Sequence, residues 1–387
     1  GSAGMNRLSR PLLLTQVLLL GVLALGGLLA ACDVPKPPAE ALTPVVGSAT
    51  RTPKIIDPNV PTATPAPMTL PATGRLWFLR GGVLWTAAPD GSGAKAVSTN
   101  KATSPPVPNG AGTKVAYLSE RKLVLLDVAS GQETTLVEAD MSPLQRPSWS
   151  PDDKQIAYFT EDATQYGTEV VWAIPAAGGA PQHVTALADG GYRSGPTFEH
   201  VASWAGDGRR LAVSGPQGPI HILPLDQTAG DPKVVNGGEP TWSTDSRTLL
   251  YTETLNGALA LQDVVTDDFQ PYRNEKRLDG TRLGQYAQAP LPRFNADASL
   301  ILYRAQGGDG APAVAIRARP DGSEQLFLPG NNAGWAPDGQ WLVYETGTLV
   351  PTEAGKMWQP QGLARIRADG SGQTDVLSDA SWPAWSK

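Results

Sequence analysis

The residues that could carry out chemistry are few, and they lie far apart in the chain. The 387 residues include one Cys and three His. A single Cys excludes a disulfide within the chain and a Cys-based zinc site. The three His form no metal-binding motif, and the sequence contains no Gly-x-Ser-x-Gly elbow or phosphate-binding loop. We therefore expect no metal, no cofactor and no catalytic activity.

A few acidic residues and one His keep an enzyme as an alternative. Glu199, His200 and Glu353 lie on long predicted loops, where they could act as general acid and base in a lyase or glycosidase. Five other carboxylates recur at one position of a repeat, which indicates turn formation. These are Asp152, Asp207, Asp245, Asp297 and Asp338.

Aromatic and arginine side chains on the long loops favour binding. Tyr, Trp and Arg are the residue types that anchor protein interfaces. We predict a binding face that contains Tyr166, Tyr192, Arg193, Phe198, His200, Tyr272, Arg273, Tyr286 and Trp358.

These side chains need a scaffold, and the sequence repeats one hairpin. The clearest copy runs from Pro147-Ser148-Trp149 through Asp152 to Ile156-Ala157-Tyr158. We call the positions that match Trp149 and Tyr158 in each copy the Trp-equivalent and the Tyr-equivalent. In six copies these two positions lie nine residues apart. Pro and Asp favour a turn after the Trp, and the residues that follow alternate as in a strand. Ile156 and Tyr158 should therefore face one side of that strand and Ala157 the other.

The hairpin resembles the TolB-type, WD40-like β-propeller repeat, whose consensus is close to Pro-x-Trp-Ser-Pro-Asp-Gly-x-x-Ile-Ala-Tyr. The resemblance covers Gly74–Lys387 and implies an all-β propeller of four-stranded antiparallel blades. Trp-equivalents and Tyr-equivalents each number seven, which predicts seven blades, with six blades as the alternative. Residues 383–387 look like a first strand and residues 75–79 like a second. We expect these two strands to pair and close the ring.

The connections between the hairpins vary in length, whereas the spacing from Trp to Tyr does not. In a propeller, the connections that can absorb extra residues emerge on one face of the ring. We expect that face to carry loops at residues 161–168, 186–200, 267–291 and 346–361. Such loops on a rigid scaffold are frequent binding sites.

The start of the chain predicts a targeting segment. Arg7 and Arg10 precede an apolar run over residues 11–29, which is typical of a secretory signal. Leu29-Ala30-Ala31-Cys32 resembles the lipobox of bacterial lipoproteins. The resemblance implies that residues 1–31 are a lipoprotein signal peptide and that Cys32 is lipidated. It places the protein on the extracytoplasmic side of the cell membrane, with a transmembrane anchor as the alternative.

Residues 32–73 predict a disordered tether. Residues 33–73 include ten Pro and seven Thr, and no aromatic residue. Such a segment buries too little apolar surface to offset the entropy of folding. Residues 74–387 are then the propeller domain.

The charge narrows the range of partners. A net charge of −6 argues against nucleic-acid binding. We predict a monomer, anchored in the membrane through Cys32, that binds a protein or cell-envelope partner as a non-catalytic scaffold. The alternatives are the propeller enzyme and a small-ligand or saccharide receptor that uses the central channel. A receptor would line a deep pocket with Tyr192, Tyr286 or Trp358.

Overall fold

The computed structural model describes Leu70 and residues 74–387, with gaps at 143–144, 163, 166–167, 189–198, 217, 228, 253–258, 264–268, 272–285, 289–291, 308–313, 321–323 and 353–354. The predicted signal peptide, Cys32 and the rest of the predicted tether lie outside the described residues. Within the described part of the chain, no helix has the length and apolar character needed to cross a membrane.

The described strands form seven antiparallel sheets. The first two sheets in chain order contain β4 (Val107–Pro108), β5 (Lys114–Ser119), β6 (Lys122–Asp127) and β7 (Glu133–Glu138), then β8 (Ser148–Trp149), β9 (Gln155–Glu161), β10 (Thr168–Pro175) and β11 (Gln182–Ala188). The next two contain β12 (Val201–Trp204), β13 (Arg210–Ser214), β14 (Ile220–Pro224) and β15 (Lys233–Val235), then β16 (Gly238–Trp242), β17 (Thr248–Thr252), β18 (Leu259–Asp263) and β19 (Phe269–Pro271).

The remaining sheets follow the same plan. A five-stranded sheet contains β20 (Tyr286–Gln288), β21 (Arg293–Phe294), β22 (Ile301–Gly307), β23 (Val314–Ala318) and β24 (Leu326–Phe327), in which β20 and β21 both pair with β22. The next contains β25 (Asn331–Trp335), β26 (Trp341–Thr352), β27 (Gly355–Arg367) and β28 (Thr374–Ser378). The last contains β29 (Ser381–Ser386), β1 (Arg75–Arg80), β2 (Val83–Ala87) and β3 (Lys95–Lys101).

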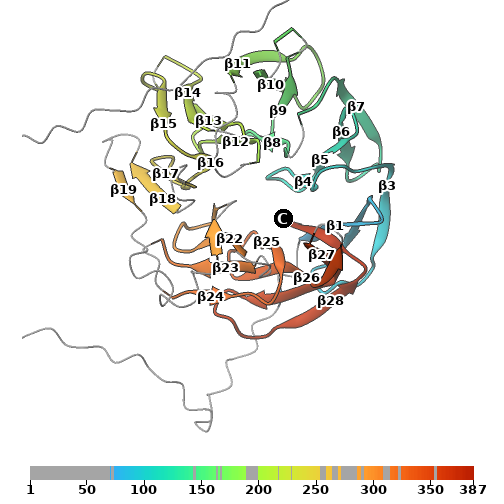
Figure 1. Ribbon diagram of the computed structural model, residues 1–387. Helices are drawn as coiled ribbons and strands as arrows, with labels where there is room; N and C mark the ends of the chain where they lie inside the picture. Colours follow the sequence, from blue (N-terminus) through green and yellow to red (C-terminus); the bar gives the residue numbers. More distant parts are fainter. Residues whose placement is uncertain are drawn as a thin grey trace, which may run out of the picture. The chain divides into compact units, whose positions relative to one another are not determined.

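The sheets follow one another around a ring, with the C-terminus near its centre (Figure 1). This is a β-propeller of four-stranded antiparallel blades, as the sequence predicts. We number the blades 1 to 6 in chain order from β4–β7. The sheet of β29 with β1, β2 and β3 is the closing blade.

The closing blade joins the two ends of the described chain. β29 pairs antiparallel with β1, so that Leu76 lies opposite Trp385 and Trp77 opposite Ala384. The buried Trp77 indole also donates a hydrogen bond to Ser386 Oγ at 2.9 Å. The prediction that the C-terminal strand pairs with the N-terminal strands is confirmed.

Alternate side chains of each second strand pack against opposite neighbours. In β9, Ile156 and Tyr158 pack against blade 1, whereas Ala157 and Phe159 pack against blade 3. All four side chains are almost completely buried. The alternation predicted for this strand is confirmed, and each blade depends on both of its neighbours to bury its faces.

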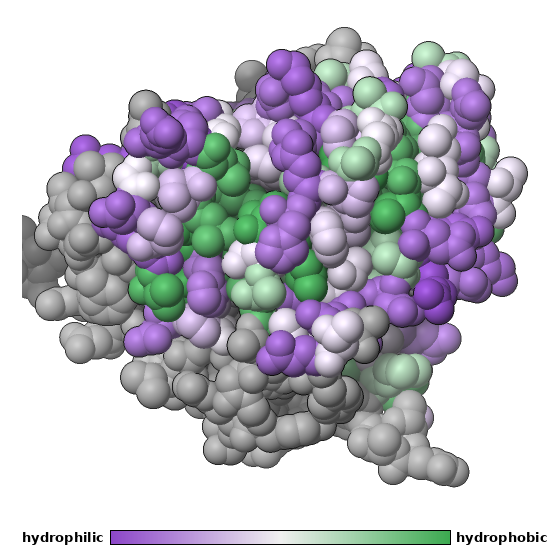
Figure 2. Space-filling model, turned by 90° about the horizontal axis from the view of Figure 1, so that it is seen from above, coloured by the Kyte–Doolittle hydropathy of each residue, from purple (hydrophilic) through white to green (hydrophobic). Residues whose placement is uncertain are grey.

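The outer edge of the ring is more hydrophilic than the buried faces between the blades. Seen from the side in Figure 2, hydrophilic residues form much of the described rim, and hydrophobic residues show between them. Few large hydrophobic side chains are exposed among the described residues, and they are Leu225, Val234 and Met357.

In blades 2, 3 and 4 the Trp of the repeat links the blade to the previous one. Its indole N–H donates to the carbonyl of the residue before the Trp-equivalent in that blade. Three such bonds are present, from Trp149 to Val107 (2.9 Å), from Trp204 to Ser148 (3.1 Å) and from Trp242 to Ser203 (3.0 Å). The indole N–H of Trp335 is buried without a hydrogen-bond partner in the described structure.

The recurring Asp residues shape the turns that follow the Trp. Each accepts a hydrogen bond from the backbone N–H two residues later, at 2.9–3.2 Å, and the acceptors are Asp152, Asp207, Asp245, Asp297 and Asp338. Hydrogen bonds from Ser150, Ser243 and Ser299 lower the pKa of Asp152, Asp245 and Asp297, respectively. The prediction that these carboxylates form turns is confirmed.

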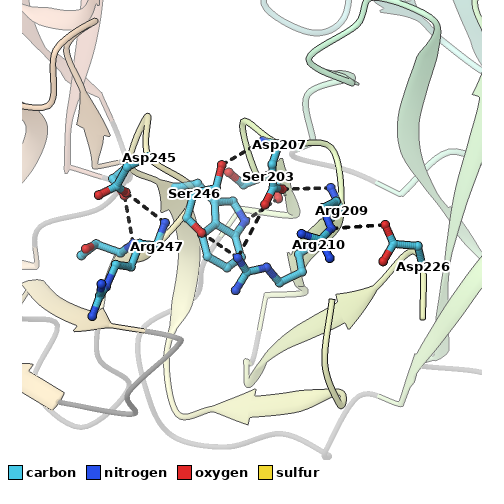
Figure 3. Close-up of polar contacts among 11 residues, drawn as sticks. Ser203, Asp207, Arg209, Arg210, Asp226, Asp245, Ser246 and Arg247 are labelled. Atoms are coloured by element: carbon cyan, nitrogen blue, oxygen red, sulfur yellow. Dashed lines mark hydrogen bonds and ion pairs between the residues drawn. The ribbon is translucent and has the colours of Figure 1, made fainter. Parts of the chain in front are cut away.

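The residue after the recurring Asp contacts the turn of the previous blade. Asp153 and Ser246 occupy this position with φ of 58° and 62°. The Asp153 carboxylate accepts from the backbone N–H groups of Gly110 and Ala111 at 2.8 and 2.9 Å. Ser246 Oγ accepts from the Asp207 N–H at 2.8 Å, as Figure 3 shows.

Arg210 strengthens the same contact between blades 3 and 4 (Figure 3). Its guanidinium donates to the Ser246 carbonyl at 2.8 Å and lies over the Trp242 ring, 5.1 Å from the centroid. The Trp bonds and these turn contacts fix the inner strands relative to one another.

Replacing Trp149 by Phe should destabilise the propeller more than replacing Trp335 by Phe. Both changes remove a similar amount of ring surface, but only Trp149 loses a hydrogen bond to a neighbouring blade. We expect a difference of about 1 kcal/mol in the free energy of unfolding. Urea denaturation of both variants measures it, and equal losses would contradict a stabilising role for the Trp bond.

Candidate binding site at the channel mouth

The innermost strands enclose a cavity along the centre of the ring. Its volume is about 450 Å³. The lining comes from the first strand of every blade and the residues just before it, and includes Pro105–Pro108, Arg146–Trp149, His200–Trp204, Glu239–Thr241, Pro292–Arg293, Gly334–Trp335 and Pro383–Trp385. The residues at the start of these strands form one end of the cavity, which we call the channel mouth.

A local irregularity in three blades shapes this mouth. The residue three positions before the Trp-equivalent has a positive φ in Glu239 (56°), Asn332 (43°) and Trp382 (50°). The strand register shifts beside Glu239 and Asn332, as in a β-bulge. Bulges redirect side chains at the ends of strands. Glu239 lines the channel, and Asn332 and Trp382 line a smaller cavity beside it.

Gln145 fixes the backbone beside Arg146. Its side chain is buried and takes the place of a strand partner. The amide N–H donates to the carbonyls of Ser142 (2.8 Å) and Phe159 (2.7 Å), and its oxygen accepts from the Phe159 N–H at 2.8 Å. Ser104, at the same position of blade 1, accepts from the Leu118 N–H at 2.9 Å. The repeat thus satisfies a buried backbone group with a side chain where the inner strand begins.

Two arginines lie near each other at the mouth, where both line the channel and the smaller cavity beside it. Arg146 pairs with Glu199 at 3.3 Å. Arg293, on β21, makes no ion pair or hydrogen bond with a described residue. Burial and the nearby positive charge of Arg146 lower the pKa of Arg293 to about 10, and Glu199 opposes the shift. Arg293 therefore has a charge that its surroundings do not balance.

A third arginine lies on the same side of the ring. A cavity of about 30 Å³ lies beside the channel, and Arg146, Arg293 and Arg304 all line it. Arg304 Nε is buried and has no hydrogen-bond partner among the residues described. Three arginines from two blades, Arg146 of blade 2 and Arg293 and Arg304 of blade 5, thus line one small space.

Glu345 and Trp358 border this region. Glu345 is fully buried, and the Asn332 side-chain amide donates to its carboxylate. Burial raises the pKa of Glu345, while Asn332, Trp358 and Arg304 oppose that shift. Trp358 is half-buried on β27, and its ring lies against Gly347.

His200 lies at the same mouth with a carboxylate beside it. Its side chain is buried and its Nε2 contacts the Glu169 carboxylate. The ring also packs on Phe159, with 5.3 Å between the ring centroids. His200 Nδ1 has no hydrogen-bond partner in the part of the chain that is described.

The predicted binding face is only partly described. His200 lines the channel at its mouth, whereas Trp358 lies beside Glu345 and does not line the channel. Tyr166, Tyr192, Arg193, Phe198, Tyr272 and Arg273 lie outside the described residues, as do Glu353 and Cys32, and Tyr286 is placed on β20 without a described side chain. The prediction of a loop at residues 346–361 is wrong, because β26 and β27 continue through most of it as a paired hairpin. The extra residues of this interval lengthen β26 and β27 and so extend a sheet.

The sequence reasoning missed Arg146, Arg293 and Arg304, because it searched the long loops. A signal was present in the repeat. The residue before the Trp-equivalent is small or uncharged in the other blades, namely Val107, Ser148, Ser203, Thr241, Gly334 and Ala384, whereas Arg293 occupies that position before Phe294. Arg304 follows the Tyr-equivalent, where Leu79, Leu118 and Phe159 stand in other blades.

No group of His, Cys, Asp and Glu among the described side chains is arranged to hold a metal ion. The mouth brings Arg146, Arg293 and Arg304 together with Glu199, Glu239 and Glu345, and Arg293 and the Nε of Arg304 have no described hydrogen-bond partner. Such an arrangement can bind an anionic group through charge-assisted hydrogen bonds.

Comparison with known proteins supports the fold. No protein-family model and no curated protein matches this chain. An oligogalacturonate lyase from Vibrio parahaemolyticus is 13% identical, with a TM-score of 0.51 over 79% of this chain and 85% of that chain. A TolB-like protein from Agrobacterium tumefaciens is 15% identical, with a TM-score of 0.43 over 66% and 87%. At these identities the likeness concerns the fold alone, that of a β-propeller.

Replacing Arg293 by Met should raise the midpoint of thermal unfolding, because it removes a half-buried charge that lies beside Arg146 and forms no ion pair with a described carboxylate. Replacing Arg146 by Met should lower the midpoint, because Glu199 then loses its cation. We expect each substitution to change the free energy of unfolding by about 1 kcal/mol. Thermal denaturation followed by Trp fluorescence tests the opposite signs, and destabilisation of similar size in both variants would refute the unbalanced charge.

Proposed function

We propose that this protein is a non-catalytic binding module on the extracytoplasmic face of the cell membrane. It acts as a monomer, is anchored through lipidated Cys32, and binds a protein or cell-envelope partner through the channel mouth and the connections around it. The observation that carries the proposal is the convergence of charged and aromatic side chains from several blades on an open cavity of about 450 Å³.

The rigidity of the ring supports a binding role. Arg146, Glu239 and Arg293 are each positioned by a short inner strand or the residues just before it. The Trp bonds and turn contacts fix those strands before any partner arrives. A preformed site loses less conformational entropy on binding than a flexible loop does.

We also infer a ring of seven blades. The seven sheets among the described strands and the seven Trp-equivalents support this number. A ring of six blades with a divergent extra element is the alternative.

The tether gives the proposed module its reach. A Pro-rich segment extends about 3.1 Å per residue, so residues 33–73 could hold the ring on the order of 100 Å from the membrane. Two acyl chains on Cys32 would give stable attachment without a spanning helix.

Replacing Cys32 by Ser should release the protein from the membrane, because the thiol that accepts the lipid is then absent. In cells fed labelled palmitate, we expect the wild-type chain to carry label and the variant to carry none. The variant should move from the membrane fraction to the soluble fraction. Unchanged membrane attachment in the unlabelled variant would contradict a lipid anchor.

A partner at the mouth should be captured from one face of the ring only. Met357, on the β26–β27 hairpin, and Gln340, in the turn on the opposite face of the same blade, are both exposed. A photo-crosslinking residue at position 357 should yield a defined adduct in the native host, and the same residue at position 340 should not.

The identity of the adduct is read by mass spectrometry. An adduct of equal yield from both positions, or from neither, would contradict partner binding at the mouth.

A further inference from the structure

We propose that the small cavity between Arg146, Arg293 and Arg304 is a binding site for a carboxylate, whose attached body occupies the central channel. The inference deepens the proposed binding role of the channel mouth and rests on it. It specifies the chemistry that the partner must present there.

The positive charge of Arg293 is the first argument. Its guanidinium has no ion pair or hydrogen bond with a described residue, and Arg146 lies close enough to depress its pKa. A half-buried cation beside a second cation is unfavourable unless an anion joins them. A carboxylate between the two groups would remove that cost.

Arg304 has a buried donor that a ligand could satisfy. Its Nε is buried and has no partner within the described structure, and the residue lines the same cavity. A buried donor without an acceptor costs free energy that a ligand oxygen would recover. Arginine presents its donors in a planar fork that matches the two oxygens of a carboxylate.

The balance of charge favours a monoanion. Glu199 pairs with Arg146 at 3.3 Å, and Glu345 interacts electrostatically with Arg304. Arg293 is then the cation that remains unmatched. A dianion would bring excess negative charge beside Glu199, Glu345 and the channel-lining Glu239, so a monoanion suits the site better.

The size of the two cavities fits a small charged head on a larger body. The cavity at the arginines is about 30 Å³, which is room for roughly two water molecules and so for a carboxylate group. It shares Pro105, Arg146, Arg293 and Pro383 with the lining of the 450 Å³ channel. Proline rings at this junction and Trp382 beside it offer apolar surface to the body of the ligand.

Acetate is the probe that tests the carboxylate site, because it is the smallest carboxylate with a carbon attached. The full chain in detergent is heated in sodium acetate that replaces sodium chloride at constant ionic strength. Acetamide serves as the uncharged match. We expect acetate to raise the unfolding midpoint along a saturable curve with a dissociation constant on the order of 1 mM. At an acetate concentration about ten times the dissociation constant, the midpoint should rise by about 2 °C.

Variants separate this site from general effects of the salt. Arg293→Met and Arg304→Met should each weaken acetate binding at least tenfold, whereas Arg121→Met should bind as the wild type does. Arg121 is an exposed arginine that pairs with Asp140, so its loss controls for charge. Because Arg293→Met is expected to be more stable than the wild type, a failure to bind would not reflect unfolding.

A midpoint that rises without saturation, or equally in all four proteins, would overturn the carboxylate site. That result would leave the crosslinking test of the mouth intact, so the two proposals can fail separately. With a positive result, glucuronate and N-acetylalanine are compared as carboxylates on a sugar and on a peptide. The one that binds tighter than acetate identifies the source of the carboxylate.

Discussion

Antiparallel pairing of β29 with β1 is the contact on which the propeller depends. It places Trp385 opposite Leu76 and allows the Trp77 indole to bond Ser386. Without this pairing the closing blade would lose its innermost strand, and two blades would each expose a face that is now buried. Closure also fixes the inner strands around one channel, so residues distant in sequence, such as Arg146 and Arg293, can meet at a single mouth.

The mouth gathers three arginines around one small cavity. Turn carboxylates such as Asp152 and Asp245 have several donors, and buried polar groups such as Gln145 are satisfied by the backbone. Buried polar atoms without a hydrogen-bond partner also occur elsewhere in the described ring, as at the Trp335 indole, but Arg304 Nε lacks a partner in the same small cavity that Arg146 and Arg293 line. A buried donor without an acceptor weakens the free protein, and a ligand that accepts its hydrogen bond would recover that free energy.

Much of the fold could be predicted from the sequence, because one short motif repeats with fixed spacing. The motif contains the turn chemistry of Asp152 and the alternation around Tyr158, which determine a hairpin locally. The site was harder to predict from the sequence, because it depends on which residues of distant blades meet at the channel. The long interval between repeats was a poor guide to loops, because extra residues such as 346–361 can lengthen a hairpin as readily as a loop. The more informative signal was an arginine at a repeat position that other blades fill with uncharged residues, as at Arg293.

A crystal structure of the chain grown with acetate tests the central claim most directly. The account predicts planar density for one carboxylate between Arg293 and Arg304, at the end of an open channel enclosed by the inner strands. Side chains of Arg293 and Arg304 that instead turn to pair with Glu199 and Glu345, with no anion between them and a channel filled by side chains, would contradict it.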